Sequence, residues 1–161
     1  MYASDISREL WELGFELFND RDRMMAKFIQ ASILDAGSDL GQLKGMIDVI
    51  IANQFIHLFD WEGQVSVIKR IVELSKPGTV LIGYQGAKVP PEELQRPWGN
   101  MYFHDQETFR KLWQRVELET RSKWDLDVKL VDLSEWGMER EDLDWMPEGR
   151  KGINFVVTRQ S

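Results

Sequence analysis

Polar side chains at the ends of apolar segments are the residues of this chain best placed to do chemistry. Asp5 follows a short apolar stretch, and its carboxylate can accept hydrogen bonds from the two neighbouring hydroxyls of a ribose. Asn53 and Gln54 follow a second apolar segment, and Tyr84 and Gln85 follow a third, where they are expected to line a ligand site. Asp5 has a simpler alternative role, which is to cap the helix that comes next.

The two histidines, His57 and His104, are the candidate general bases. An acceptor oxygen with a high pKa needs such a base, whereas a carboxylate is already ionised at neutral pH and needs none. A structural role is preferred over a chemical one for His57, which follows a strand end. His104, which ends a proline-bearing segment and is placed to reach an acceptor, is a candidate on the same terms. The chain has no cysteine, which excludes disulfides and thiolate ligands, and no metal site is expected from two histidines.

The elements that carry these residues alternate between strand and helix, which predicts an α/β fold with a parallel sheet. In such a sheet, ligands bind beyond the carboxyl ends of the strands. Strands are expected over residues 1–5, 26–33, 47–53, 79–84, 124–130 and 153–158. Helices are expected after Ser7, over Trp61–Leu74 and after Asp105.

Three segments carry more specific expectations. The continuously apolar run of residues 47–53 is typical of a strand buried on both faces. Residues Gln85–Phe103 contain Pro90, Pro91 and Pro97 and are expected to form a long connection that acts as a lid or binding loop. Trp98, Met101 and Tyr102, in the same segment, are expected to supply apolar walls for an acceptor.

Composition limits the class of protein. The 161 residues suit one domain that spans the whole chain. Twenty basic and 27 acidic side chains give a net charge of −7, which argues against a nucleic-acid or anionic-membrane partner. No apolar run approaches the roughly 18 residues of a membrane span, so a cytoplasmic location is expected. Seven Trp, eight Phe and three Tyr exceed the needs of one core and suggest a pocket or a covered surface.

Two segments in sequence resemble class I S-adenosylmethionine-dependent methyltransferases. Asp48–Leu58 resembles the fourth strand of that family and its following loop, and Leu74–Ile82 resembles the turn that leads into the fifth strand. Asn19–Met24, Gly83–Gln85 and His104–Glu107 resemble the methyltransferases of fungal secondary-metabolite clusters, particularly those acting on polyketide–terpenoid hybrids. The resemblance runs from the second strand of the family to its last.

The resemblance implies a Rossmann-like sheet, mostly parallel with antiparallel strands at its C-terminal end, and S-adenosylmethionine as the cofactor. It implies methylation of an oxygen, a carboxylate oxygen among the choices, on a small apolar secondary metabolite. Asp5 and Ile6 match the ribose-binding position of the family, Ser32 and Ile33 match the adenine surroundings, and Asn53 faces the methionine end. An acid usually stands at the position of Ser32, and Asp35 lies nearby. Gln54, Tyr84 and Gln85 are the implied substrate-side residues.

One departure from the family concerns its first strand and Gly-rich loop. Four residues precede Asp5, so we expect a truncated methyltransferase domain that lacks both. The family places that strand between its second and fourth strands, and its loss leaves two strands without a neighbour. Such a chain closes the gap, takes a strand from a partner or a second copy, or fails to fold well. A non-catalytic, methyltransferase-like partner subunit is the alternative function. A dinucleotide oxidoreductase is less favoured, because the chain has no GxGxxG fingerprint.

Overall fold

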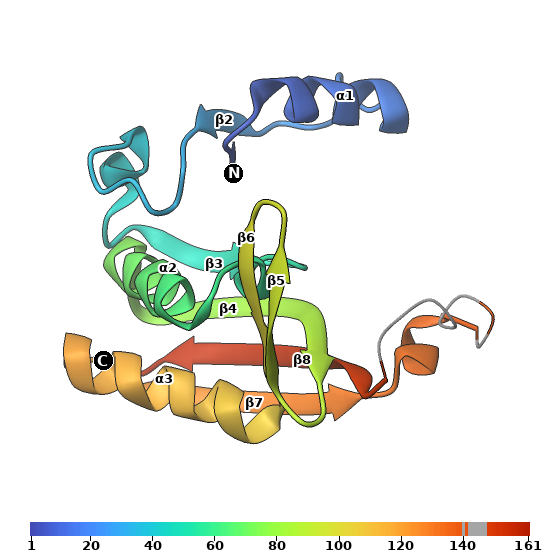
Figure 1. Cartoon of the computed structure of the whole chain (residues 1–161). Helices are drawn as coiled ribbons and strands as arrows, with labels where there is room; N and C mark the ends of the chain where they lie inside the picture. The colour runs from blue at the N-terminus through green and yellow to red at the C-terminus, as the bar shows by residue number, and fades with distance from the viewer. Residues whose placement is uncertain (140, 142–147) are drawn as a thin grey trace. The chain divides into compact units, whose positions relative to one another are not determined.

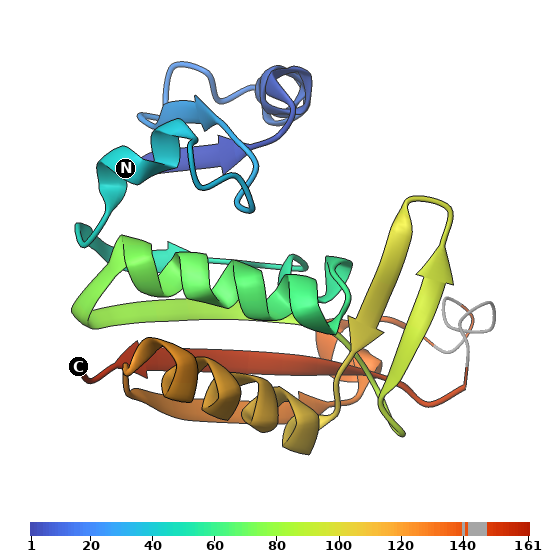
Figure 2. The ribbon, with the colours of Figure 1, turned by 60° about the vertical axis from the view of Figure 1, so that its left-hand side comes forward.

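The computed structural model describes residues 1–139, 141 and 148–161. They form two compact units, which are residues 1–44 and residues 45–161 (Figures 1 and 2). The expected single domain stays a prediction. Within the described part of the chain, no helix combines the length and apolar character needed to cross a membrane.

The first unit is a βαβ element. Its members are β1 (Tyr2–Asp5), α1 (Arg8–Phe18), β2 (Lys27–Gln30) and the short 3-10 helix η1 (Asp39–Leu43). β1 and β2 pair in parallel, with Asp5 opposite Gln30. Ser7 caps α1 as predicted, because its side-chain oxygen accepts a hydrogen bond from the backbone N–H of Leu10 at 3.3 Å.

Helix α1 contacts the small sheet through aromatic side chains. The ring of Trp11 stacks on Phe28 of β2 at 5.2 Å and meets the edge of Phe15 at 5.0 Å. The leucine stripe of the same helix, formed by Leu10, Leu13 and Leu17, is exposed. The first unit therefore covers the aromatic side of α1 only in part and leaves its aliphatic side uncovered by the described residues of the unit.

The second unit contains a four-stranded sheet, a β-hairpin and two long helices. Its members are β3 (Ile47–Ile51), η2 (Ile56–Leu58), α2 (Trp61–Leu74), β4 (Ser75–Lys88), β5 (Glu92–Arg96), β6 (Gly99–Phe103), α3 (Gln106–Thr120), β7 (Trp124–Val131), η3 (Leu133–Trp136) and β8 (Arg150–Arg159). The strand order is β3-β4-β8-β7. β3 and β4 are parallel, whereas β8 is antiparallel to both β4 and β7. The mixed sheet confirms the α/β class and the antiparallel C-terminal strands.

Helices α2 and α3 cover one face of this sheet (Figure 2). α2 spans the predicted residues, and Asp60 caps it by accepting from the backbone N–H of Gly63 at 2.7 Å. Asp105 begins α3 in a capping box with Thr108, as the predicted cap. The apolar face of α3 buries Phe109, Leu112, Trp113 and Val116. The sequence pattern was therefore sufficient to predict both helices.

The sequence-based expectation for the third strand was wrong in one respect. The run over residues 47–53 was expected to be buried on both faces, but Val49 is 54% exposed and Ile51 is 71% exposed. The cause is the uncovered face of the sheet, because Val49 and Ile51 share it with the exposed Ile82 and Val156, whereas α2 and α3 cover the other face. β3 is also an edge strand, which pairs only with β4 among the described residues.

The expectation of a long open connection over Gln85–Phe103 was also wrong. Residues 85–88 continue β4, because they pair with residues 150–153 of β8. The remainder folds as the antiparallel hairpin of β5 and β6, in which Arg96 pairs with Gly99 around Pro97 and Trp98 (Figure 1). Pro97 therefore lies in the turn of this hairpin, while Pro90 and Pro91 lie in the connection from β4 to β5.

Candidate functional site

In the first unit, Asp5 supports the start of α1 and keeps one carboxylate oxygen without a partner. Its Oδ1 accepts a hydrogen bond from the backbone N–H of Ser7 at 2.8 Å. Among the described residues, Oδ2 has no hydrogen-bond partner. Ser7, and not Asp5, caps α1, so Asp5 orients the cap residue through Oδ1, while Oδ2 is available for a ribose hydroxyl.

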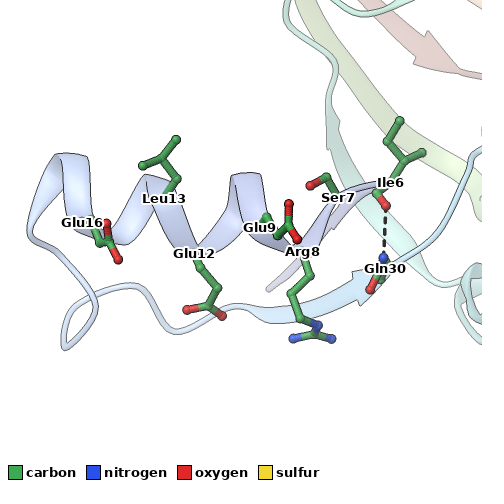
Figure 3. Close-up of a pocket in the computed structure, with 8 residues that line it drawn as sticks. All are labelled: Ile6, Ser7, Arg8, Glu9, Glu12, Leu13, Glu16 and Gln30. Carbon is green, nitrogen blue, oxygen red and sulfur yellow. Dashed lines mark hydrogen bonds between the residues drawn. The ribbon is translucent and has the colours of Figure 1, made fainter.

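The residues expected around a nucleoside meet at the carboxyl ends of β1 and β2. The backbone N–H of Ala31 donates to the carbonyl oxygen of Asp5 at 3.0 Å, and Gln30 Nε2 donates to the carbonyl oxygen of Ile6 at 3.2 Å (Figure 3). Ser32 follows directly, and its hydroxyl accepts from the backbone N–H of Leu34 at 3.2 Å. The fold thus brings Asp5, Ile6, Ser32 and Ile33 to one edge of the small sheet.

An open groove of about 850 Å³ runs along α1 in the same unit. Figure 3 shows that the labelled side chains fan out from the helix instead of converging on one point. Its lining residues are Ile6, Ser7, Arg8, Glu9, Glu12, Leu13, Glu16 and Gln30. Three carboxylates face one guanidinium in that set, so the groove is a poor place for an anionic ligand.

In the second unit, the ends of β3 and β4 are joined by two hydrogen bonds. The backbone N–H of Gln54 donates to the carbonyl oxygen of Tyr84 at 2.7 Å. The side-chain oxygen of Gln54 accepts from the backbone N–H of Gly86 at 3.0 Å. Asn53 precedes this link and is exposed. The fold therefore brings the predicted Asn53, Gln54 and Tyr84 together at one sheet edge.

Tyr84 and Gln85 lie on opposite faces of β4, since side chains alternate along a strand. Tyr84 is on the face away from the helices, and its ring meets the edge of Trp136 at 5.2 Å. Gln85 is 0% exposed, and neither atom of its amide group has a hydrogen-bond partner among the described residues. A ligand on the Tyr84 face therefore does not meet the Gln85 side chain.

His104 is held in a fixed tautomer inside the second unit. Gln64 donates its side-chain NH₂ group to the carbonyl oxygens of Phe59 at 2.9 Å and Tyr102 at 2.8 Å. Its oxygen must then accept from Nε2 of His104, which lies 2.9 Å away. Burial lowers the pKa of His104 to about 3, although Asp105 opposes the shift. The imidazole is neutral, fully buried and packed against Tyr102 and Trp61.

His57 lies in η2 and is 7% exposed. Its ring lies 5.2 Å from the ring of Phe103, and Nδ1 has no hydrogen-bond partner among the described residues. Burial, assisted by the positive charge of Arg150, lowers the pKa of His57 to about 4. At neutral pH the side chain is therefore uncharged and has a free ring nitrogen.

Arg150 is a residue that the sequence reasoning missed. Its guanidinium lies over the ring of Phe103 at 3.9 Å, and burial lowers its pKa, with a further contribution from Arg96. No local pattern marks it, because its place opposite Lys88 depends on the ladder between β4 and β8. Only pairing of segments distant in the chain brings Arg150 to Phe103 and His57.

The three residues that were expected to form apolar walls for an acceptor lie in different surroundings. Met101 is buried in β6, whereas Trp98 is exposed at the tip of the hairpin. Tyr102 meets the edge of Trp61 at 5.2 Å. The aromatic contact between Tyr84 and Trp136 is the feature of the second unit that best fits an apolar wall. Within the described residues, no group of three or more metal-ligating side chains occurs.

Curated proteins similar to this chain are fungal methyltransferases, and no family model matches the chain. O-methyltransferase phiE of Fungal sp. (strain ATCC 74256) is 34% identical over 99% of this chain and 58% of its own length. Asnovolin E/Chermesin D methyltransferase nvfJ of Aspergillus novofumigatus is 29% identical over 99% of this chain and 57% of its own length. The chain thus spans a little more than half the length of these relatives.

Solved structures with a similar fold include several S-adenosylmethionine-dependent methyltransferases. One is the 1,6-didemethyltoxoflavin-N1-methyltransferase of Burkholderia thailandensis, solved with S-adenosylhomocysteine, at a TM-score of 0.66 and 10% identity, covering 99% of this chain and 61% of that one. The 4+2 cyclase SpnF also has a similar fold, at a TM-score of 0.67 and 11% identity, covering 99% of this chain and 66% of that one. Likeness at this identity concerns the fold alone. Its sequence is therefore similar to part of several fungal methyltransferases, and its fold is similar to that of S-adenosylmethionine-dependent methyltransferases.

Proposed function

We propose that this chain carries a large part of an S-adenosylmethionine-dependent methyltransferase that methylates an oxygen of a small apolar secondary metabolite, such as a polyketide–terpenoid. The observation that carries the proposal is the match to fungal methyltransferases over 99% of the chain. One of these relatives is named for methylating asnovolin E and chermesin D, which supports a small-molecule acceptor.

On the cofactor side, Asp5, Ile6, Ser32 and Ile33 of the first unit would hold the nucleoside part of S-adenosylmethionine. The chain offers a fitting group for a ribose, because Asp5 Oδ2 has no partner among the described residues. When bound, the cofactor supplies an electrophilic methyl group on sulfur. The protein then mainly orients donor and acceptor.

On the acceptor side, Gln54 and Tyr84 are the proposed contacts, with the ring of Trp136 beside Tyr84. Gln85 stays a proposed substrate-side residue because its buried amide group has no hydrogen-bond partner among the described residues, although it lies on the other face of β4. The environments of the histidines favour an acceptor that is already ionised. His104 commits Nε2 to Gln64, and the low pKa of His57 makes it a weak base.

A strand-donating partner or a second copy of the chain belongs to the alternative function, that of a non-catalytic subunit. The two edge strands of the four-stranded sheet differ in polarity, and this difference supports the alternative function. β7 presents Asp125, Asp127 and Lys129, and charges of this kind discourage strand addition. β3 presents the exposed Val49 and Ile51 instead.

Calorimetric titration of the purified chain with S-adenosylhomocysteine tests the leading function. We expect one site per chain with weak affinity, because the edge of β3 is open in the described sheet. Absence of binding up to the solubility limit of the ligand would overturn cofactor binding and favour the non-catalytic subunit. The expected cytoplasmic location stays a prediction, which imaging of a fluorescent fusion in the source cells tests.

A further inference from the structure

Gln54 has a backbone conformation that its position in the chain does not explain. Its φ of 49° lies in the left-handed region, which residues other than glycine seldom adopt. Asn19 and Arg121 share this conformation, but they are the C-caps of α1 and α3, where it is common. Gln54 instead lies in the turn that follows β3. Such conformations persist where surrounding contacts hold them, and they are frequent at functional sites.

Two hydrogen bonds hold Gln54 and fix the orientation of its side-chain amide group. Its backbone N–H donates to the carbonyl oxygen of Tyr84 at 2.7 Å, and the backbone N–H of Gly86 donates to its side chain at 3.0 Å. Because the backbone N–H can only donate, the side-chain atom that faces Gly86 must be the oxygen Oε1. Nε2 is therefore at the other end of the amide group, and it takes no part in the link between the two strands.

The place of Gln54 in the second unit suits a residue that contacts a ligand. Gln54 is exposed and follows the carboxyl end of β3, which is the edge of an α/β sheet where ligands bind. Tyr84, whose carbonyl oxygen accepts from Gln54, is 40% exposed, and its ring meets the edge of Trp136 at 5.2 Å. Small-molecule sites combine apolar surfaces of this kind with a few oriented polar groups. An amide held in one orientation beside an aromatic pair has both features.

We propose that Nε2 of Gln54 donates a hydrogen bond to a carbonyl or carboxylate oxygen of the acceptor, whose apolar body lies against Tyr84. Gln54 thereby selects between acceptors, because an amide nitrogen can donate a hydrogen bond and cannot accept one. A ligand that offers no acceptor atom at this place gains nothing from Gln54. That the ligand is the methyl acceptor rests on the proposed function, whereas the hydrogen bond itself does not.

The variant Gln54→Glu removes the proposed donor and keeps the link to Gly86. Its carboxylate accepts from the backbone N–H of Gly86 as Oε1 does, but it carries no N–H group. Gln114→Glu, at an exposed position of α3, is the matched control for the added charge. Both variants should therefore unfold at nearly the same urea concentration as the unchanged chain.

The probes are acetophenone, which carries one carbonyl oxygen, and ethylbenzene, which has nearly the same shape without that oxygen. Each is titrated into the isotope-labelled full chain and followed by NMR. We expect acetophenone, and not ethylbenzene, to shift the side-chain NH₂ signals of Gln54. Acetophenone should bind Gln54→Glu about fivefold or more weakly, because one hydrogen bond is lost. Ethylbenzene binding to Gln54→Glu, and binding of both probes to Gln114→Glu, should be unchanged.

Acetophenone that fails to bind, that leaves the side-chain signals of Gln54 unmoved, or that binds Gln54→Glu as tightly as the unchanged chain overturns the proposal. If Gln54→Glu does not fold, the shift of the Gln54 signals in the unchanged chain decides between the same results. Titration with S-adenosylhomocysteine tests the proposed function separately. Acetophenone bound through Gln54 without cofactor binding overturns the proposed function alone, and cofactor binding with unmoved Gln54 signals overturns the hydrogen bond alone.

Discussion

The side-chain oxygen of Gln64 lies 2.9 Å from Nε2 of His104, and both side chains are completely buried between α2 and β6. Gln64 also donates to the carbonyl oxygens of Phe59 and Tyr102. One amide group therefore ties the beginning of α2 to the hairpin and sets the tautomer of the histidine. Nδ1 of the same histidine has no hydrogen-bond partner among the described residues, so the ring depends on Gln64 for its described hydrogen bond.

Replacing Gln64 should destabilise the second unit. Gln64→Met keeps the length of the side chain but leaves His104 Nε2 without an acceptor, which costs about 2 kcal/mol or more in the free energy of unfolding. Urea denaturation measures the change. Gln114→Met, at an exposed position of α3, is the matched control and should change stability by less than about 0.5 kcal/mol. Equal effects of the two substitutions would contradict the role of Gln64.

The buried histidines should make the protein less stable as the pH falls below about 6.5, the ordinary histidine pKa. In the folded chain the pKa is about 4 for His57 and about 3 for His104. Between these values and the unfolded pKa, the unfolded state binds more protons, so stability rises with pH. Each histidine contributes up to about 1.4 kcal/mol per pH unit in that window.

Urea denaturation at pH 5 and pH 7 measures this slope. The variant His57→Gln should retain only the contribution of His104, and its slope should therefore be smaller than that of the unchanged chain. Restricting the comparison to pH 5–7 limits the contribution of carboxylates, which titrate mainly below this range. Identical slopes would show that His57 is not buried in its neutral form.

Gly83 is expected to tolerate no side chain. A Cβ atom there would lie 2.4 Å from Phe155 Cζ and 2.5 Å from the carbonyl oxygen of Ala52. Gly83→Ala should lower stability by about 1–3 kcal/mol through overpacking. Gly14→Ala is the control, because Gly14 lies in α1 with open space around it, and alanine there should stabilise by up to about 1 kcal/mol. Thermal denaturation shows whether each substitution raises or lowers the stability of the protein.

Asp5→Ala should weaken S-adenosylhomocysteine binding if Asp5 holds the ribose. Loss of two hydrogen bonds to a charged acceptor is expected to cost about tenfold or more in affinity. Asp22→Ala, an exposed acid of the same unit, is the control for charge alone. Calorimetry gives the affinities, and an unchanged value for Asp5→Ala removes the ribose role from Asp5.

The open edge of β3 should be the place where the chain associates. Ile51→Lys adds a charge to this edge and should reduce concentration-dependent association in sedimentation experiments. Stability should change by less than about 0.5 kcal/mol, because Ile51 is largely exposed. Leu118→Lys, at an exposed position on α3, controls for added charge and lost apolar surface. Association that persists in Ile51→Lys but not in Leu118→Lys would place the contact on α3 instead.

Local patterns in the sequence determined the elements and their class. The caps Ser7, Asp60 and Asp105 satisfy backbone donors within three residues of themselves, so the start of each helix is a local property. The alternation of residue types along β7 likewise predicted that one face of the strand is exposed to solvent. Asp125 and Asp127 are exposed, while Trp124 and Val128 are buried. The resemblance to class I methyltransferases also needed only short segments.

Tertiary structure decided which side chains meet. The apolar run of β3 looks the same in sequence whether one face of the sheet or both are covered, and α2 and α3 cover only one. The β4–β8 ladder turned residues 85–88 into strand and brought Arg150 to Phe103, 47 positions away in the sequence numbering. Local propensity cannot specify such contacts, because they depend on the register between segments that are distant along the chain.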